Sequence, residues 1–256
     1  MVHRLLLAVG TRAGLEAHRV QFVAFLGALI FALHPVQTEA VAYVSGRSSS
    51  LSAALFLAAV LAYLRGRNTG RWGWSWLLSP GLFLLSLLVK EMALVLPLVL
   101  VLLEGMGPDC GRKALTAPLP HGLRAGLGGA ALVLHSGYRS FLENSFGLRG
   151  PGEQLRGALE GLGYLFSKLV WPVGLNLDPP LAVPAAWNLR LVGTALAAAA
   201  VLGTGLWALQ RQRWVGFSLC WGLLLLLPTQ GPVPRLDLAN ERHLYLALAG
   251  FAFGKF

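Results

Sequence analysis

Residues 34–47 read HPVQTEAVAYVSGR and lie between two apolar segments, 20–33 and 51–64. The imidazole of His34, the carboxylate of Glu39 and the guanidinium of Arg47 therefore fall at the boundary between two expected membrane helices. Charge at membrane depth is costly unless it faces a wet cavity, so it marks a functional site by default. This stretch predicts a helical membrane protein with polar groups gathered between its helices.

The composition of the whole chain also indicates a membrane protein. Of its 256 residues, 55% are hydrophobic and 12% are charged, whereas a soluble domain carries about 25% charged residues. The net charge of +10 comes from 21 Lys and Arg against 11 Asp and Glu. In a membrane protein this excess fits basic cytoplasmic loops and attraction to anionic lipids, so no nucleic-acid partner is expected.

Apolar runs predict an all-α fold, a polytopic membrane helix bundle of about eight spans with one further re-entrant or interfacial helix. The expected helices cover residues 20–33, 51–64, 72–89, 92–103, 123–138, 191–209, 214–227 and 244–256. Segment 157–177 contains Lys168 and a break at Trp171-Pro172, which favours an interfacial or re-entrant helix. In the alternative interpretation, this segment crosses the membrane and one arginine pair lies outside.

Basic loop residues set the expected topology, because Lys and Arg accumulate on the cytoplasmic side. The residues that define the inner side are Arg4, Arg12, Arg19, Arg65, Arg67, Arg71, Arg112, Lys113, Arg124, Arg211 and Arg213. The outer side then receives residues 34–50, 90–91, 139–156, 178–187 and 228–243. The polar groups that interrupt the apolar runs thus converge on one face, although the topology was set by basic loop residues alone.

Two further polar segments lie on this outer side. Lys90-Glu91 separates two apolar runs, where a plain turn would more often carry Gly, Ser or Asn. The two charges either face water or form a site in which the lysine binds an anion, and we favour the site. Residues 240–243, Asn-Glu-Arg-His, precede the last apolar run and fit both helix capping and an Arg–carboxylate site. Residues 34–47 likewise fit both a proline-terminated helix end and a site.

Other chemistry-bearing patterns are missing from the sequence. There is no Walker or Rossmann motif, no Ser-His-Asp spacing and no cluster of metal ligands, so neither a metal nor a tightly bound cofactor is expected. The two cysteines, Cys110 and Cys220, support no disulfide framework. His135, within an apolar run, fits a buried structural histidine. Lys90 and Arg235 are basic groups beside carboxylates on the outer side, and they suit an anionic ligand such as a phosphate.

Together, these segments resemble the membrane region of the transmembrane and tetratricopeptide-repeat O-mannosyltransferases and their bacterial relatives. The likeness rests on residues 34–41 with Gly46-Arg47, on 89–91, on 165–178 and on 241–245, in this order along the chain. It covers about residues 20–256, and the first block is the most specific.

The resemblance implies a membrane-integral glycosyltransferase of the C-type fold. Such an enzyme passes a sugar, for instance mannose, from a polyprenyl-phosphate donor to a protein hydroxyl on the lumenal or periplasmic face. The membrane would be that of the endoplasmic reticulum or the bacterial inner membrane. The family pattern also has an acidic outer loop before the first helix found here and a repeat domain after the membrane region. Residues 1–256 are therefore expected to form a single, partial membrane domain without a soluble domain. The expected partners are membrane lipids, the lipid-linked sugar and a protein acceptor.

Under this hypothesis, Lys90 and Arg242 bind the donor phosphate. Glu39 and Glu91 hold sugar hydroxyls or orient the basic residues, and Asp237 or Glu39 is the candidate base for the acceptor hydroxyl. The remaining candidate substrate-binding residues are His34, Arg47, Glu241 and Tyr245.

Two alternatives stay open at this point. A non-catalytic truncated relative or membrane scaffold would share the same polar segments without transferring a sugar. A transporter would also contain interrupted helices such as those at Lys90-Glu91 and Trp171-Pro172. It should, however, show a repeat between its halves, and none is evident in the sequence.

Overall fold

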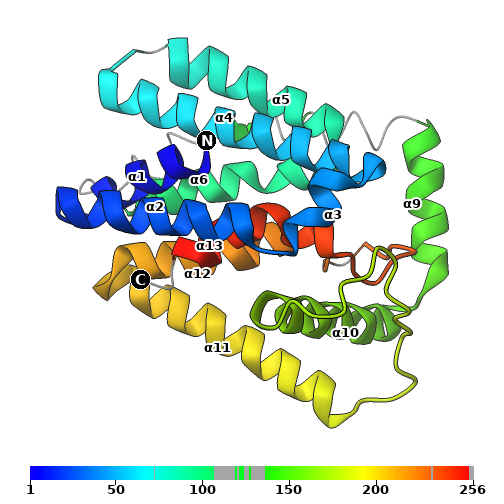
Figure 1. Ribbon diagram of the computed structural model, residues 1–256. Coiled ribbons are helices and arrows are strands. Elements are labelled where there is room, and N and C mark those ends of the chain that lie inside the picture. Colours follow the sequence, from blue (N-terminus) through cyan, green and yellow to red (C-terminus); the bar gives the residue numbers. More distant parts are fainter. Residues whose placement is uncertain are drawn as a thin grey trace.

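The computed structural model describes residues 1–71, 73–106, 119, 121–123, 127, 136–231 and 233–253. Within these residues the chain is all-helical, as predicted (Figure 1). The helices are α1 (Val2–Arg12), α2 (Ala17–Leu33), α3 (Gln37–Ala42), η1 (Val44–Gly46), α4 (Arg47–Thr69), η2 (Trp74–Leu78), α5 (Ser79–Val89), η3 (Glu91–Val95), α6 (Leu96–Gly105), α9 (Ser136–Leu148), α10 (Pro151–Val170), α11 (Leu189–Arg211), α12 (Arg213–Leu226), η4 (Glu241–His243) and α13 (Leu244–Phe253).

The breaks between the helices follow from particular residues. Pro35 cannot continue α2, and His34 before it is extended, with ψ at 126°. Lys90 is also extended, with φ at −159° and ψ at 134°, and it separates α5 from η3. Gly70 ends α4 in the left-handed conformation that glycine adopts most readily. Two of the polar segments singled out in the sequence are therefore helix interruptions, from which side chains can project across the ends of neighbouring helices.

The hydrophobic core centres on α12, which packs against α6, α11 and α13. Its fully buried Trp221 meets the ring of Phe56 from α4 at 6.0 Å and the ring of Phe217 at 5.5 Å between centroids. The indole N–H of Trp221 donates to the carbonyl oxygen of Leu246 on α13 at 3.1 Å. Because a buried indole needs such a partner, this bond fixes α13 beside α12, and thereby positions the segment that leads into α13.

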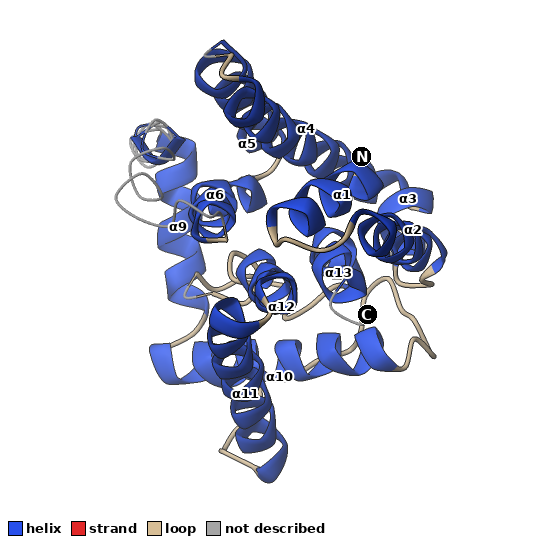
Figure 2. Cartoon of the chain, turned by 90° about the vertical axis from the view of Figure 1, so that its left-hand side faces the viewer, coloured by secondary structure: helices blue, strands red, loops and turns tan. Residues whose placement is uncertain are grey.

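Helix α10 runs across the direction of the other long helices. Figure 2 shows α10 lying across the view, whereas α2, α6 and α12 are seen nearly end-on. Its contacts lie along one end of the bundle: Gln154 donates to the carbonyl of Gly231 at 2.9 Å, and the carbonyl of Leu169 lies 3.3 Å from the His34 imidazole. Gly161 permits this approach, since a Cβ there would meet the backbone carbonyl of Leu238. Helix α10 thus covers the end of the bundle that carries His34.

The number of membrane spans is not confirmed. Among the described residues, two helices, α4 and α11, are long and apolar enough to cross a membrane by length and composition. Most of the apolar part of α4 is buried in the bundle, whereas only 17% of that of α11 is buried. Exposed side chains of α11 include Leu196, Leu202, Leu206 and Trp207. An apolar surface of this kind calls for a covering of lipid or protein.

Several predicted boundaries need correction. Residues 139–156, expected to form an outer loop, belong to α9 and to the start of α10. Gly150 and Pro151 mark a helix start there, because the Glu153 carboxylate accepts the N–H of Gly150 at 3.2 Å. The N-terminal helix α1 was not among the predicted helices. Most of the expected helix 123–138 lies outside the described residues, as do Cys110, Arg112, Lys113, Arg124 and His135.

Candidate functional site

Glu39 joins two distant parts of the chain. It lies in the short helix α3, and its side chain is buried. Oε2 accepts the backbone N–H of Arg242 at 2.7 Å, and Oε1 lies 3.7 Å from Nη1 of the same residue. Burial raises the pKa of Glu39, and the hydrogen bond and guanidinium of Arg242 oppose this rise. Oε1 makes no hydrogen bond, so beyond its ion pair with Arg242 this oxygen keeps its capacity to accept one.

Gly46 explains why α3 can lie against the start of α4. A Cβ at this position would collide with the backbone carbonyl oxygen of Glu39 and crowd the Cα of Ala40. Only glycine allows the two backbones to approach so closely. The glycine of the first polar segment therefore acts by fixing the position of Glu39.

Lys90 approaches the same region from the break between α5 and η3. Its Nζ donates to the Ser49 hydroxyl of α4 at 2.6 Å. In the part of the chain that the structure describes, no carboxylate forms an ion pair with it. Burial lowers the pKa of Lys90 to about 8, and the positive charges of Arg242 and Arg235 contribute. Lys90 is thus a half-buried cation whose charge is not neutralised by a directly contacting carboxylate.

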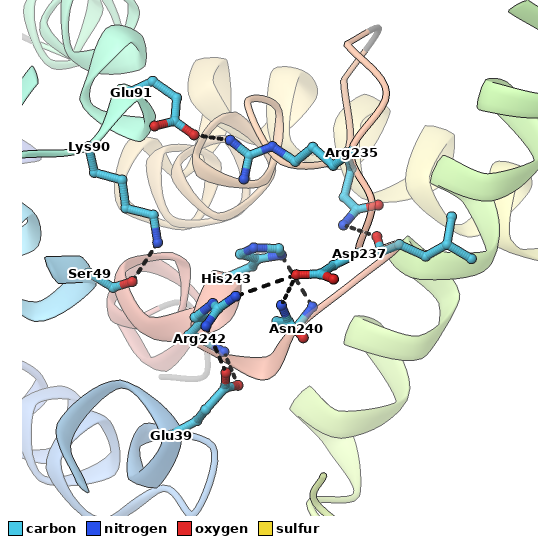
Figure 3. A network of polar contacts seen from close by, with 11 residues as sticks. Glu39, Ser49, Lys90, Glu91, Arg235, Asp237, Asn240, Arg242 and His243 are labelled. Carbon is cyan, nitrogen blue, oxygen red and sulfur yellow. Dashed lines mark hydrogen bonds and ion pairs between the residues drawn. The ribbon is translucent and has the colours of Figure 1, made fainter. Parts of the chain in front are cut away.

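The neighbouring arginines are paired with carboxylates. Arg235 forms an ion pair with Glu91, the residue after Lys90. Arg242 lies 3.6 Å from Asp237 in addition to its contact with Glu39, and Asp237 is half-exposed. Figure 3 shows these side chains, from α3, the turn at 90–91 and the segment 235–243, directed toward one another. The network therefore assembles three cations and three carboxylates from distant stretches of sequence.

Two further residues hold the segment before α13 in place. Nδ2 of Asn240 donates to Asp237 at 3.0 Å, and its backbone N–H donates to Nδ1 of His243 at 3.4 Å. His243 is buried, and burial together with the neighbouring arginines and Lys90 lowers its pKa well below the usual value. The imidazole is therefore neutral at physiological pH, and its role in this geometry is to shape the turn.

Glu241 points away from Lys90, toward α10. Its Oε1 accepts the Tyr164 hydroxyl at 2.7 Å and the backbone N–H of Asn176 at 2.9 Å. Burial, and then the hydrogen bond to the carboxylate, raise the pKa of Tyr164. Glu241 thus fastens α10 and the following loop to the end of the bundle, whereas Glu39 contacts Arg242.

Two cavities flank the Glu39–Arg242 pair. One, of about 20 Å³, is lined by Lys90, Ser49 and Arg242 together with apolar residues. The other, of about 370 Å³, is lined by Glu39, Glu241, Thr38, Tyr43 and Asn176 with apolar neighbours. The first holds about one water molecule, and the second is large enough for a small ligand. Basic groups line the smaller cavity and acidic groups the larger one.

The structure also places the remaining predicted residues. The His34 ring lies 3.3 Å from the Leu169 carbonyl and accepts the N–H of Val36 at 3.3 Å, so it links α2 to α10 beside the network. Arg47 is exposed at the start of α4, and within the described residues it is not part of the network. Tyr245 lines the smaller cavity, and its ring packs against Phe31 at 5.4 Å.

Ser49 and Tyr164 were not among the predicted site residues. Arg235, which the sequence singles out as a basic group on the outer side, enters the network through its ion pair with Glu91. Nothing in the sequence distinguishes Ser49 within its run of serines, and Tyr164 is one aromatic residue among many. Among the described residues, no group of His, Cys, Asp and Glu is arranged to hold a metal ion.

Comparison with known proteins adds a partial likeness. Protein O-mannosyl-transferase TMTC1 of Homo sapiens and that of Mus musculus are each 44% identical to the chain over 75 residues. Parts of this chain thus resemble protein O-mannosyl-transferases. Protein O-mannosyl-transferase Tmtc3 of Drosophila melanogaster is 35% identical over 105 residues.

These similarities cover only part of each chain. The matches with the human and mouse proteins span 28% of this chain and 8% of the relative, and the match with the Drosophila protein spans 38% and 11%. The chain thus corresponds to about a tenth of the length of these relatives. No protein-family model and no solved structure matches it. The matched segments support the O-mannosyltransferase family that the polar segments suggest. They do not test the C-type fold or the likeness to bacterial relatives.

Proposed function

We propose that this chain is part of a membrane glycosyltransferase that moves a sugar, for instance mannose, from a polyprenyl-phosphate donor to a protein hydroxyl. The partial likeness to proteins named O-mannosyl-transferases supports the reaction class. The observation that carries the proposal is Lys90, a half-buried ammonium group that donates to a serine and forms no ion pair with a carboxylate in the described chain. A half-buried cation of this kind is suited to an anionic ligand.

The donor phosphate binds between Lys90 and Arg242 in this proposal. Both residues line the cavity of about 20 Å³, which is too small for a phosphate as it stands. Donor binding therefore requires the Lys90 ammonium to leave Ser49 and widen the cavity. Arg235 stays paired with Glu91 and adds positive potential, because a guanidinium near the site attracts an anion without touching it.

The acceptor hydroxyl enters the cavity of about 370 Å³ beside Glu39. Oε1, which makes no hydrogen bond in the structure, takes the hydroxyl proton while the acceptor oxygen bonds to C1 of the sugar. The bond between C1 and the phosphate oxygen breaks, and its electron pair leaves with the phosphate, whose charge Lys90 and Arg242 neutralise. Burial raises the pKa of Glu39 and makes its carboxylate a stronger base. Asp237, half-exposed and 3.6 Å from Arg242, is the other candidate base.

The setting of this reaction is a multi-pass helical bundle of the C-type fold in the endoplasmic reticulum or a bacterial inner membrane. The exposed apolar surface of α11 supports contact with lipid. Helix α10 lies at the membrane interface and covers the site, which faces the lumen or periplasm. The orientation follows from the basic residues at the other end of the bundle, among them Arg12 and Arg67.

Transfer of labelled sugar in membranes that contain the chain tests this function. Lys90→Ala and Glu39→Gln are expected to lower transfer by about 100- to 10,000-fold, the range of charge stabilisation and general-base catalysis. Arg47→Ala is the matched control, because Arg47 is exposed and lies outside the network. Transfer by Lys90→Ala at the rate of the unsubstituted chain would overturn the proposal.

A second candidate function is that of a non-catalytic membrane scaffold. One observation favours it: Glu39 accepts the N–H of Arg242 at the start of η4, where a helix begins, and so acts as a cap. A scaffold of this kind would transfer no sugar with or without Lys90, so Lys90→Ala would leave the labelled-sugar signal at background in both proteins. The two functions therefore differ in whether Lys90→Ala lowers the transfer of labelled sugar.

A further inference from the structure

A second polar network lies near the C-terminal end of α4, whereas Ser49 lies near the N-terminal end of this helix. There the buried carboxylate of Glu104 accepts the Tyr63 hydroxyl at 2.8 Å, Nε of Arg67 at 3.0 Å and Nη2 of Arg12 at 3.1 Å. Ser49 and Arg67 are separated by about 27 Å along the axis of α4, at 1.5 Å per residue. The two networks therefore occupy opposite ends of the bundle, and the second is independent of the proposed transferase site.

A cavity of about 730 Å³ opens beside this second network. Its polar lining consists of Arg4, Thr11 and Arg12 from α1, Asn68 from α4 and Arg213 from α12. No carboxylate is found among its lining residues in the part of the chain that the structure describes. We call it the arginine cavity.

Positive charge exceeds negative charge at the arginine cavity. The single carboxylate of Glu104 is shared between Arg12 and Arg67, so it cannot neutralise both, and Arg4 and Arg213 add two further charges. Only Nη2 of Arg12 is hydrogen-bonded: Nε and Nη1 of this guanidinium are buried without a partner. Buried donors of a charged group are costly when unsatisfied. An anion with several acceptor oxygens would relieve this cost.

The ligand class follows from the shape of these donors. Guanidinium groups present planar pairs of N–H donors that match a phosphate in two-point contacts. The lining also includes the apolar Leu7 and Ala8. Helix α2 packs beside α1 (Figure 1) and exposes Phe22 and Phe25 along its flank. Arginines and apolar residues in one cavity, next to a helix with exposed aromatic side chains, fit an amphiphile whose phosphate occupies the cavity.

We propose that the arginine cavity binds the phosphate headgroup of an anionic phospholipid. Binding there would tie α1 to α4 and α12 at the end of the bundle opposite the Glu39–Arg242 pair. The same oxygen chemistry is offered by free inorganic phosphate, and the two sources differ in whether an acyl chain contributes.

Native mass spectrometry of the full chain released from phosphatidylcholine nanodiscs containing phosphatidic acid tests this site. The chain is expected to retain one phosphatidic acid in preference to phosphatidylcholine. Arg4→Ala combined with Arg213→Ala is expected to weaken retention by about 10- to 100-fold, the loss of one or two charge-assisted hydrogen bonds. Arg4→Glu provides a second variant, because Arg4 is exposed and its replacement leaves the core intact.

Two controls make the outcome specific. Arg211→Ala removes the same charge from an exposed position two residues from Arg213, outside the cavity lining, and it is expected to retain the lipid. Inorganic phosphate at millimolar concentration is expected to leave the lipid bound, because the acyl chains contribute to its affinity. Full displacement of the lipid by inorganic phosphate would instead identify free phosphate as the ligand. Equal retention by the double variant and the unsubstituted chain, or equal loss in Arg211→Ala, would overturn the proposal.

Discussion

The carboxylate of Glu39 accepts the backbone N–H of Arg242 at 2.7 Å, across 203 positions of the sequence. The same two residues form an ion pair, in which Oε1 lies 3.7 Å from Nη1. This pair separates a small cavity lined by basic residues from a larger one lined by acidic residues. Such a division suits a reaction that needs an anion bound on one side and a proton removed on the other.

The binding of a phosphate donor should weaken with rising pH. The pKa of Lys90 is lowered to about 8, so the ammonium loses its proton, and with it its charge, as the pH rises through this value. Donor affinity, measured by equilibrium titration between about pH 6 and pH 10, is expected to fall above pH 8. Lys90→Arg should move this fall to higher pH, since a guanidinium stays protonated. A flat profile for the unsubstituted chain would argue against a role for Lys90 in binding.

Glu39→Gln should change how stability depends on pH. The pKa of Glu39 is raised in the folded protein, so the folded state holds this proton more tightly than the unfolded state does. The stability that protonated Glu39 contributes is fully present below the pKa that Glu39 has in the unfolded chain. It is lost as the pH rises through the higher pKa of Glu39 in the folded protein.

The free energy of unfolding, measured by denaturant titration from about pH 4 to about pH 7, is therefore expected to decline more for the unsubstituted chain than for Glu39→Gln. Parallel pH profiles for the two proteins would show that burial does not penalise the charged form of Glu39.

Gly46→Ala should destabilise the fold. The added methyl group would collide with the backbone carbonyl oxygen of Glu39, and backbone cannot yield as a flexible side chain does. We expect a loss of about 1–3 kcal/mol, typical of overpacking, together with a displaced Glu39. Gly81→Ala is the matched control: it lies within α5 with no atom near its Cβ position, and it should be neutral or slightly stabilising. Equal thermal midpoints for both variants would contradict the close approach of α3 to α4.

Tyr164→Phe should loosen α10. The hydroxyl of Tyr164 is one of two donors to the buried Oε1 of Glu241, and its removal leaves a charged acceptor partly unsatisfied. The expected cost is about 1–3 kcal/mol. Hydrogen exchange of the amides of α10 is expected to increase, because Glu241 holds this helix against the end of the bundle. Tyr43→Phe, at an exposed position, is the control and should leave exchange in α10 unchanged.

The apolar pattern of the sequence predicted most of the helix bundle. Helices α2, α4 and α11 include the predicted runs, and α12 covers all but the last residue of its run, because long apolar segments bounded by Pro, Gly or charge leave few alternatives. The number of spans could not be predicted in the same way. Helices α5 and α6 have 11 and 10 residues and directly follow the short helices η2 and η3, so apolar length alone does not show whether they cross.

The site was only partly accessible to sequence reasoning. Proline and charge at positions 34–47 and 90–91 predicted helix interruptions on one face, and the structure brings Glu39, Lys90 and Arg242 into one network. The pairing of those charges depends on side-chain direction, which sequence spacing does not determine. Glu91 thus pairs with Arg235 instead of its neighbour Lys90, and Glu241 turns toward Tyr164. The sequence predicts a loop over residues 139–156, because charge and glycine there mask a helical segment.

Whether Lys90 and Arg242 hold the donor phosphate is decided by the binding of a polyprenyl-phosphate-linked sugar to the chain in nanodiscs. The affinity is expected to fall by about 10- to 100-fold in Lys90→Ala, the cost of one charge-assisted phosphate contact. It should stay unchanged in Arg47→Ala. Equal affinity in the unsubstituted chain and Lys90→Ala would show that Lys90 does not bind the donor phosphate.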